Sequence, residues 1–319
     1  MSVGVIVPVY GDARYLPDAL DAVLAQAPAP QEVVVVDDAS PSPVRLDRRH
    51  ANSCRLLRRS ARGGPGAARD TALEELETEL IACADADDVW HPGKLSIQLE
   101  ALERAPDAAA CFGRAVIAGP DGRPTGERWD TFPAGLLGPE VFAPLLFERN
   151  LIPTSSAVIR REALLEAGGF SGPPVGEDWL LWLRLVERGE RFIHEPSALI
   201  TYRRHPAGAT ADISGLAAVA LSVHEAHAGL VDEATRRRVK AADLTALARG
   251  RIRERDYATA RDALGAAARL VRPAPREVAL RVLVGIPGLR AGLGRRGPYR
   301  GAPGRAKAPA GEPYNTSVR

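Results

Sequence analysis

Two pairs of aspartates stand directly behind apolar runs in the first ninety residues. Asp37 and Asp38 follow a run of valines, and Asp85 and Asp87 follow the small apolar residues 80–84. Two carboxylates this close can reach one hard cation, and Mg²⁺ or Mn²⁺ commonly combines one or two protein carboxylates with phosphate oxygens and water. The second pair therefore indicates a divalent cation that neutralises a diphosphate; a helix N-cap or an acidic turn is the alternative.

The first pair and the glycine-rich segment behind it have the residue types that bind a nucleotide. An aspartate at a strand end can accept a hydrogen bond from a nucleobase N–H or a ribose hydroxyl, although an Asx turn explains Asp37 and Asp38 as well. Residues 63–70 resemble a phosphate loop at a helix N-terminus, but they match neither the Walker A nor the dinucleotide-binding pattern. Arg69 would lie one turn into that helix, where it could neutralise a carboxylate or a phosphate.

Glu177 and Asp178 are candidates for proton transfer. They begin an expected helix over residues 177–187, where acidic side chains also suit the helix dipole and the free N–H groups of the first turn. A carboxylate at the rim of a cleft can take a proton from an attacking alcohol. Arg204 and His205 belong to a basic cluster that could bind diphosphate, with neutral His205 able to ligate a metal, or that could be a solvated turn.

Alternating strands and helices must position these side chains. Buried strands are expected at 3–9, 32–36, 54–57, 80–84 and 108–112, with helical spacing of apolar residues between them. This rhythm predicts an α/β fold with a mostly parallel sheet and helices on both faces. Ligands bind such sheets beyond the carboxyl ends of the strands, where both aspartate pairs stand. Further expected elements are a helix within 67–80, a helix opened by Pro92, a loop at 119–139, a strand at 155–159, a helix at 162–167 and a strand at 199–202.

Composition divides the chain into three parts. Residues 1–212 would form the α/β domain, residues 213–272 have Ala, Leu and Arg at helical spacing, and residues 273–319 are a basic tail rich in Gly, Pro and Arg. We expect two short helical hairpins in the second part and disorder in roughly the last twenty residues. Residues 251–319 carry 15 Lys+Arg and 5 Asp+Glu, a net charge of +10, which leaves 27 and 35, a net charge of −8, for residues 1–250.

The basic tail is a candidate for weak peripheral contact with a membrane. Residues 275–287 mix apolar side chains with arginines and are too short to span a bilayer. They could lie in the membrane surface with the arginines against anionic headgroups, or they could pack on the neighbouring helices. A nucleic-acid partner is not expected, because almost no aromatic residues are interleaved with these arginines.

The whole chain has the composition of a globular protein. Of its 319 residues, 45% are hydrophobic and 26% charged, close to the usual globular mix. No apolar run reaches about 18 residues, and the N-terminus lacks the basic region of a signal peptide. The three cysteines are widely spaced and show no metal-ligand spacing. These features predict a cytoplasmic protein in a reducing compartment.

Taken in order, these motifs resemble the family 2 inverting glycosyltransferases of the GT-A fold. The resemblance runs from about Val3 to Pro206, roughly two thirds of the chain. Its specificity comes from the order and spacing of six segments more than from any one of them. The matching segments are 5–10, 36–40, 64–70, 84–95, 168–179 and 202–205.

The resemblance implies metal-dependent transfer of one sugar from a nucleoside diphosphate sugar, UDP- or dTDP-linked, to an acceptor hydroxyl. Asp178 would be the catalytic base with Glu177 beside it, and Asp87 and His205 would hold Mg²⁺ or Mn²⁺. Tyr10 would stack on the base and Asp38 would accept a hydrogen bond from its N3–H. The implied donor-nucleotide-binding residues are Pro8, Tyr10, Asp37, Asp38, Gly64, Gly66, Arg69, Asp85 and Arg204.

Three departures from the family pattern bear on specificity. Arg62 and Asp70 stand where the family often has Asn, in the segment implied to cradle the nucleotide. The Gln-x-x-Arg-Trp motif of processive polysaccharide synthases is missing after Tyr202, which favours transfer of a single sugar. Two other functions share the sheet and its carboxylates: a sugar-nucleotide nucleotidyltransferase, and a non-catalytic scaffold that binds a sugar nucleotide.

Overall fold

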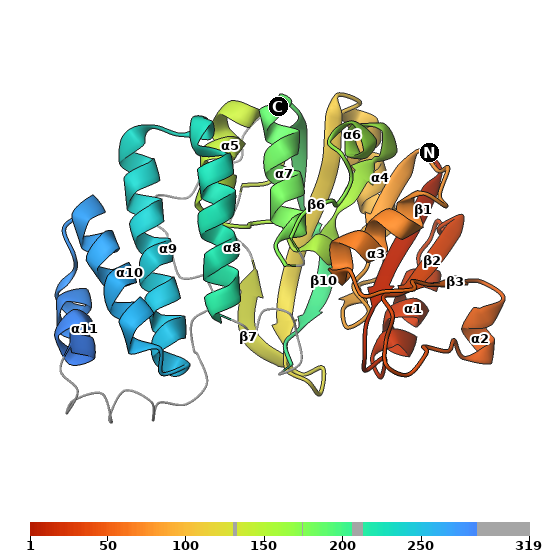
Figure 1. Cartoon of the computed structure of the whole chain (residues 1–319). Coiled ribbons are helices and arrows are strands. Elements are labelled where there is room, and N and C mark those ends of the chain that lie inside the picture. Colours follow the sequence, from red (N-terminus) through yellow and green to blue (C-terminus); the bar gives the residue numbers. More distant parts are fainter. Residues whose placement is uncertain (130–132, 174, 206–212, 286–319) are drawn as a thin grey trace.

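The computed structural model describes residues 1–129, 133–173, 175–205 and 213–285, and one mixed sheet runs through the first three of these ranges (Figure 1). The strand order is β3-β2-β1-β4-β9-β6-β10-β5, with β7 paired to β6 and β8 paired to β10. The strands are β1 (Val3–Val9), β2 (Glu32–Asp37), β3 (Arg55–Arg58), β4 (Leu80–Cys83), β5 (Val89–Trp90), β6 (Ala108–Ala118), β7 (Pro124–Trp129), β8 (Gly135–Leu137), β9 (Val158–Arg160) and β10 (Arg191–Arg203).

The core of this sheet is parallel, as the sequence predicts. Strand β1 pairs in parallel with β2 and β4, β2 pairs in parallel with β3, and β6 pairs in parallel with β10. Antiparallel β9 joins the two parallel sets by pairing with β4 and β6. The valine-rich runs of β1 and β2 suit strands that are buried on both faces.

Helices cover both faces of the sheet. Ile6 shares one hydrophobic core with α3, α5 and α7, whereas its neighbours Val5 and Val7 share another with α1 and α4. This division follows from the geometry of a strand, whose successive side chains point to opposite faces. The helices of this part are α1 (Leu16–Leu24), α2 (Arg48–Ala51), α3 (Gly64–Leu73), α4 (Lys94–Arg104), α5 (Pro139–Glu148), α6 (Arg161–Glu166) and α7 (Glu177–Glu187).

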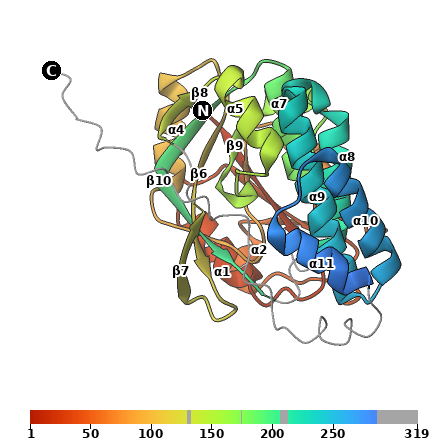
Figure 2. The same ribbon diagram turned by 90° about the vertical axis from the view of Figure 1, so that its left-hand side faces the viewer.

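Four further helices follow one another away from α7 (Figure 1; Figure 2 views the molecule from their side). They are α8 (Ile213–Ala226), α9 (Glu233–Arg253), α10 (Tyr257–Leu270) and α11 (Pro275–Gly285). Helices α9–α11 share a small core of their own, built around Ile252, Leu264 and Val284. Helix α8 therefore joins the α/β domain to the helical layer that α9–α11 form. None of the helices within the described ranges combines the length and the apolar character that a membrane crossing requires.

Several predicted boundaries are wrong. The loop expected at 119–139 contains strands β7 and β8, and β7 has five exposed residues of six, so it lacks the alternation that marks a half-buried strand. The strand expected at 155–159 begins only at Val158, because the 3₁₀ turn η1 (Thr154–Ser156) precedes it. The helix expected from Pro92 begins at Lys94, after Gly93 takes a φ of 79°.

The other differences concern where the elements begin and end. Helix α3 already begins at Gly64 and ends at Leu73, and β10 begins eight residues before the strand expected at 199–202. Helix α11 lies inside the segment 273–319 that we expected to be a tail. The expected disorder of roughly the last twenty residues concerns positions outside the described part of the chain.

Candidate active site

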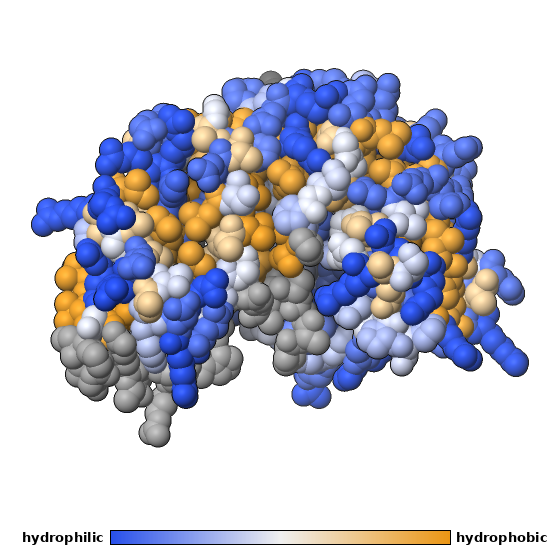
Figure 3. Space-filling model, in the orientation of Figure 1, coloured by the Kyte–Doolittle hydropathy of each residue, from blue (hydrophilic) through white to orange (hydrophobic). Residues whose placement is uncertain are grey.

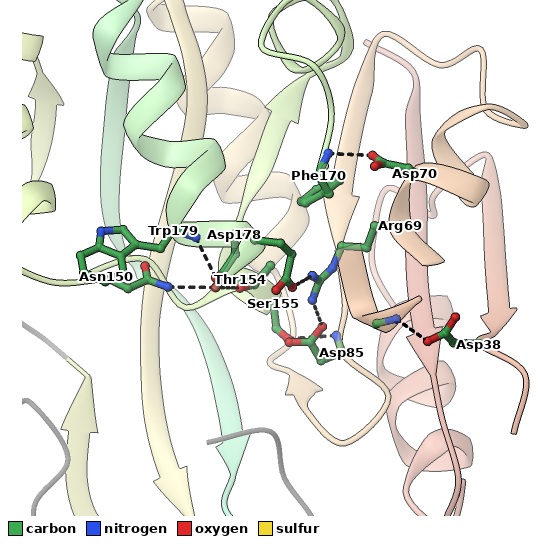
Figure 4. Close-up of polar contacts among 12 residues, drawn as sticks. Asp38, Arg69, Asp70, Asp85, Asn150, Thr154, Ser155, Phe170, Asp178 and Trp179 are labelled. Atoms are coloured by element: carbon green, nitrogen blue, oxygen red, sulfur yellow. Dashed lines mark hydrogen bonds and ion pairs between the residues drawn. The ribbon is translucent and has the colours of Figure 1, made fainter. Parts of the chain in front are cut away.

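The carboxyl ends of β1, β2 and β4 meet at one edge of the sheet, because these neighbouring strands are parallel. Tyr10, Asp38 and Asp85 follow these strand ends and therefore lie at that edge. Helices α3 and α7 begin there as well, so that Arg69 and Asp178 face the same region (Figure 4). The edge thus gathers the acidic and basic residues that the sequence singles out.

Asp37 stabilises the local fold and is almost fully buried, with 1% of its surface exposed. Its carboxylate accepts hydrogen bonds from the N–H groups of Ser40, at 2.8 Å, and Val44, at 3.1 Å, and pairs with Arg58. Burial opposes ionisation, but these hydrogen bonds outweigh it and lower the pKa of Asp37. These contacts reach N–H groups three and seven residues further on, so Asp37 fastens the loop that follows β2. The expected place of Asp37 beside the nucleotide stays a prediction.

Asp38 binds the glycine-rich loop of its own chain. One carboxylate oxygen accepts from Gly63 N–H at 2.9 Å and lies 3.0 Å from Nε of Arg59 in an ion pair, and the other accepts from Gly64 N–H at 2.7 Å. Gly64 takes a φ of 88°, which favours glycine and turns these N–H groups toward the carboxylate. With 3% of its surface exposed, Asp38 cannot accept a base N3–H unless this loop moves.

The glycine-rich loop therefore differs from the phosphate cradle that we expected. Two of its N–H groups already bind the carboxylate of Asp38. At Gly66, a Cβ atom would lie 2.6 Å from the backbone oxygen of Phe170 and 2.7 Å from Cγ of Glu177. Gly66 is thus required where α3 packs against the start of α7, and Asp70 accepts the Phe170 N–H at 2.6 Å in the same contact.

Tyr10 and Arg62 form the exposed part of the expected nucleotide site. The Tyr10 ring is 43% exposed, and the guanidinium carbon of Arg62 lies 3.9 Å from its centre. This distance is typical of a cation–π contact. Pro8 lies buried within β1, opposite Val36. The sequence singles out Tyr10 as a stacking surface, but it gives no sign that Arg62 would cover that ring.

Arg69 joins the two acidic motifs. Its guanidinium lies 2.6 Å from Asp85 Oδ1 and 2.6 Å from Glu177 Oε1, and only 3% of the residue is exposed (Figure 4). Burial disfavours the charge, but the carboxylates of Asp85 and Glu177 raise the pKa of Arg69 and keep it cationic. Of the two roles open to Arg69, neutralising carboxylates is the one seen here.

Glu177 and Asp178 have different surroundings although they are adjacent. Glu177 is buried against Arg69, and burial together with the negative charge of Asp178 raises the pKa of Glu177 to about 7, against the effect of Arg69. Asp178 is half-buried. Its Oδ2 accepts from Asn150 Nδ2 at 2.9 Å and Thr154 Oγ1 at 2.5 Å, and its Oδ1 accepts from Trp179 N–H at 2.7 Å.

The sequence analysis missed Asn150 and Thr154. They stand 28 and 24 residues before Asp178, in a segment whose composition shows no motif. Only the fold brings this segment beneath the start of α7. A single asparagine and a single threonine at such a separation carry no signal that sequence reasoning alone can use.

Asp87 and His205 meet although 118 residues separate them. Nε2 of His205 lies 2.9 Å from Oδ2 of Asp87. Burial and the nearby charge of Asp85 raise the pKa of Asp87, and His205 opposes this effect. The end of β10 is fastened to the same turn, because Arg203 N–H donates to Asp88 at 3.0 Å. The structure thus brings together the two residues implied to bind a metal.

Arg204 lies apart from these residues. Its guanidinium is 2.7 Å from the carboxylate of Glu127 on β7, and the side chain is half-exposed. The expected contact of Arg204 with the donor diphosphate would require this exposed pair to separate, and it stays a prediction.

The sequence model of the family described as "Glycosyl transferase family 2" matches residues 4–166, which is 163 of the 319 residues. The chain belongs to glycosyl transferase family 2. An uncharacterized protein of Mycobacterium tuberculosis is 30% identical over 206 residues, which cover 62% of this chain and 58% of that protein. The chain thus spans little more than half the length of this relative.

Solved structures share the fold of this family 2 chain. Residues 1–349 of S. aureus TarS in complex with UDP-GlcNAc superpose with a TM-score of 0.60 and 18% identity, covering 92% of this chain and 88% of that one. The mannosyltransferase PcManGT from Pyrobaculum calidifontis, in complex with GDP-Man and Mn²⁺, gives a TM-score of 0.53 and 23% identity, covering 91% and 82%. The predicted GT-A architecture is confirmed.

Two side chains of this family 2 protein have the chemistry to bind a divalent cation. In the described ranges no cluster of three or more His, Cys, Asp or Glu residues has a metal-binding arrangement. The carboxylate of Asp87 and the imidazole of His205 converge, however, from two distant segments. Two protein ligands suit Mg²⁺ or Mn²⁺ when phosphate oxygens and water complete the coordination. The donor set at this edge therefore fits the ion that the resemblance implies.

Proposed function

We propose that this chain is a metal-dependent, inverting glycosyltransferase that moves one sugar from a nucleoside diphosphate sugar to an acceptor hydroxyl. The observation that carries the proposal is the bridge made by Arg69. One guanidinium spans Asp85, two residues before Asp87, and Glu177, directly before Asp178. Arg69 thereby holds Asp85, which we expect beside the donor, and Glu177, which lies next to the proposed base, within reach of one reacting centre. Family membership favours this function over a nucleotidyltransferase.

In the proposed reaction, an acceptor hydroxyl attacks the anomeric carbon from the face opposite the leaving group. Asp178 takes the hydroxyl proton as the new C–O bond forms. The bond from the anomeric carbon to the β-phosphate oxygen breaks, and its electron pair leaves with the nucleoside diphosphate. One displacement inverts the anomeric centre without a covalent intermediate. The start of α7 supports this role, because Trp179 N–H helps to hold the carboxylate of Asp178.

Asp87 and His205 are the residues proposed to hold Mg²⁺ or Mn²⁺. When bound, the ion supplies positive charge that stabilises the developing charge on the leaving diphosphate. A neutral imidazole is required for ligation, so metal binding would compete with the contact between Asp87 and His205. Arg69 cannot replace the ion, because its guanidinium is already bound to two carboxylates.

We propose a UDP- or dTDP-sugar as the donor, with the base on the exposed face of Tyr10. Arg62 already lies over that ring, so it would either move aside or stack on the opposite face of the base. Stacking alone tolerates every base. The fold neighbours do not narrow the choice, since one carries UDP-GlcNAc and another GDP-Man. The proposed setting is cytoplasmic, in keeping with three cysteines that are free and buried.

The test screens the purified chain against UDP-, dTDP- and GDP-sugars, with and without Mn²⁺, by thermal shift and by release of nucleoside diphosphate. Asp178→Asn should lower kcat by roughly 10²–10⁴-fold, the range of a lost general base, with little change in donor affinity. Asp262→Asn is the matched control, because Asp262 is exposed on α10. If donor affinity collapses while kcat holds, Asp178 serves binding, and the assignment as base fails.

A further inference from the structure

The two oxygens of Asp178 have unequal surroundings. Oδ2 faces two side-chain donors, Asn150 Nδ2 and Thr154 Oγ1, at 2.9 and 2.5 Å. Among the described residues, Oδ1 receives only the N–H of Trp179. A carboxylate oxygen that faces donors is a poor place for a further proton, because protonation sets hydrogen against hydrogen. The geometry therefore distinguishes Oδ2, which faces two donors, from Oδ1, which faces one and keeps more capacity for a further proton.

The orientation of the Asn150 amide is fixed from its other end. Asn150 Oδ1 accepts the N–H of Ile152 at 3.3 Å, so the NH₂ group is the end that faces Asp178. A flipped amide would lose both contacts. The hydroxyl of Thr154 could rotate and accept instead, but an NH₂ group can only donate. Asn150 is thus the stricter of the two constraints on Oδ2.

One short segment also connects this contact to the donor side. Ser155, next to Thr154, accepts the N–H of Asp85 at 2.9 Å through Oγ and the Trp90 indole N–H at 2.9 Å through its carbonyl oxygen (Figure 4). The turn η1 therefore touches the base with one residue and the aspartate motif with the next. Its position sets the spacing between the two.

We propose that Asn150 and Thr154 are positioning residues that hold Oδ2 of Asp178 and leave Oδ1 to receive the proton of the acceptor hydroxyl. This inference rests on the proposed function, in which Asp178 is the base. It adds which oxygen reacts and which residues select it.

Other ionisable groups surround Asp178 and must be separated from this effect. They are Glu177 on the same helix, Arg69 from α3 and the buried thiol of Cys83 from β4. Glu177 matters most, because burial raises its pKa to about 7 and it lies directly before Asp178 on the same helix. A Glu177→Gln background removes that second titration.

The experiment compares the acid limb of the kcat/KM profile, measured as release of nucleoside diphosphate from the best donor of the screen. Asn150→Ala and Thr154→Val should each move the limb by about one pH unit toward higher pH, because each removes a hydrogen bond to the charged form. The shift should persist in the Glu177→Gln background, and Thr154→Ser should restore the original limb.

Ser156→Ala is the matched control, because Ser156 lies in the same turn and its hydroxyl donates to the Pro153 carbonyl, away from Asp178. It should leave the limb in place. An unmoved limb in Asn150→Ala and Thr154→Val, an equal loss of activity at every pH, or the same shift in Ser156→Ala would overturn the inference. The proposed function fails separately, if the parent chain turns over no nucleotide sugar or if Asp178→Asn keeps full activity.

Discussion

The carboxylates at the edge of the sheet fall into two groups, those saturated by the protein and those with capacity left. Asp37 and Asp38 bind backbone N–H groups and arginines and are almost fully buried. Asp87 and Asp178 are each half-buried and lie at the ends of their segments. The second group can exchange partners with less disturbance of the fold, which supports the roles proposed for Asp87 and Asp178.

Asp87→Ala should abolish transfer while leaving the fold intact. The side chain contacts His205 at the surface of the sheet edge and contributes nothing to the hydrophobic cores. Turnover with Mn²⁺ and the rise in melting temperature caused by Mn²⁺ should both be lost, while the circular dichroism melt without metal stays near that of the parent chain. Asp121→Ala, at an exposed turn before β7, should behave like the parent. Near-normal activity of Asp87→Ala would show that the metal assignment is wrong.

Glu177 should make stability depend on pH. Burial and the charge of Asp178 raise its pKa in the folded state from 4.5 to about 7, so the folded chain holds a proton that the unfolded chain releases between these values. Its favourable contribution is therefore complete below about pH 4.5 and is lost as the pH rises through about 7. Glu177→Gln lacks this titration.

When the pH is raised from 5 to 8, the free energy of unfolding of Glu177→Gln should increase by about 1–3 kcal/mol relative to that of the parent. Urea unfolding at the two pH values measures this difference, and titrations common to both proteins cancel. Glu225→Gln, at an exposed site on α8, should show a difference near zero. If the free energies of unfolding of Glu177→Gln and the parent differ by the same amount at both pH values, Glu177 does not titrate between them.

At the scale of elements, the start of α7 is built by close contact with α3. Gly66 has no room for a Cβ atom, because the Phe170 backbone oxygen and Glu177 Cγ lie within 2.7 Å of its ideal position. Gly66→Ala should therefore lower the free energy of unfolding by about 1–3 kcal/mol, as overpacking does.

Gly265→Ala on α10 is the control for Gly66→Ala. The nearest atom to its ideal Cβ, in the side chain of Arg269 of the same helix, lies 3.9 Å away, so the substitution should stabilise the protein by about 0.5–1 kcal/mol through helix propensity. Urea unfolding of both variants decides the matter. If both glycines respond alike, the close contact between α3 and α7 is not what restricts Gly66.

Elements with strong periodicity could be predicted, whereas irregular ones could not. Helix α7 has the bounds expected from the sequence, and β1 and β2 appear where their valine runs stand. Strand β7 is exposed, and the turn at Thr154 depends on contacts with distant chain segments, so neither leaves a periodic signal. The site follows the same division: aspartates behind strands were visible, but the partners of Asp178 were not.

At the scale of the whole molecule, α8 contacts the start of α7 through His224, among other residues. His224 of α8 is buried, and both its ring nitrogens face acceptors, the Asp243 carboxylate and the Phe147 carbonyl. Its ring meets Trp179, the residue after Asp178, edge to face at 4.9 Å. Helix α8 therefore supports the helix that carries the proposed base. Hydrophobic side chains gather over α8 and α9 on the face shown in Figure 3.

The outermost helix has features of both roles that we considered for the basic tail. Helix α11 packs on its neighbours through Val284 and Leu280, while Val278 and Val282, one turn apart, are 45% and 53% exposed. Arg276 and Arg281 are exposed on the same helix, and residues 286–319 carry seven Lys+Arg against one Glu. Packing and exposure thus coexist, and the outer face has the residue types of a membrane-surface helix.

The chain should therefore bind vesicles that contain phosphatidylglycerol, reversibly and only at low salt. Each basic residue near an anionic surface contributes about 1 kcal/mol, and salt screens this attraction. Sedimentation at low and high salt measures the binding. Val278→Ser with Val282→Ser, and a chain ending at Gly285, should each weaken it, whereas Val141→Ser, at an exposed valine of α5, should not. Cutting after Arg272 would remove Val284 from its core, so it is a poorer test. No sedimentation with vesicles at low salt would leave α11 as a packing element alone.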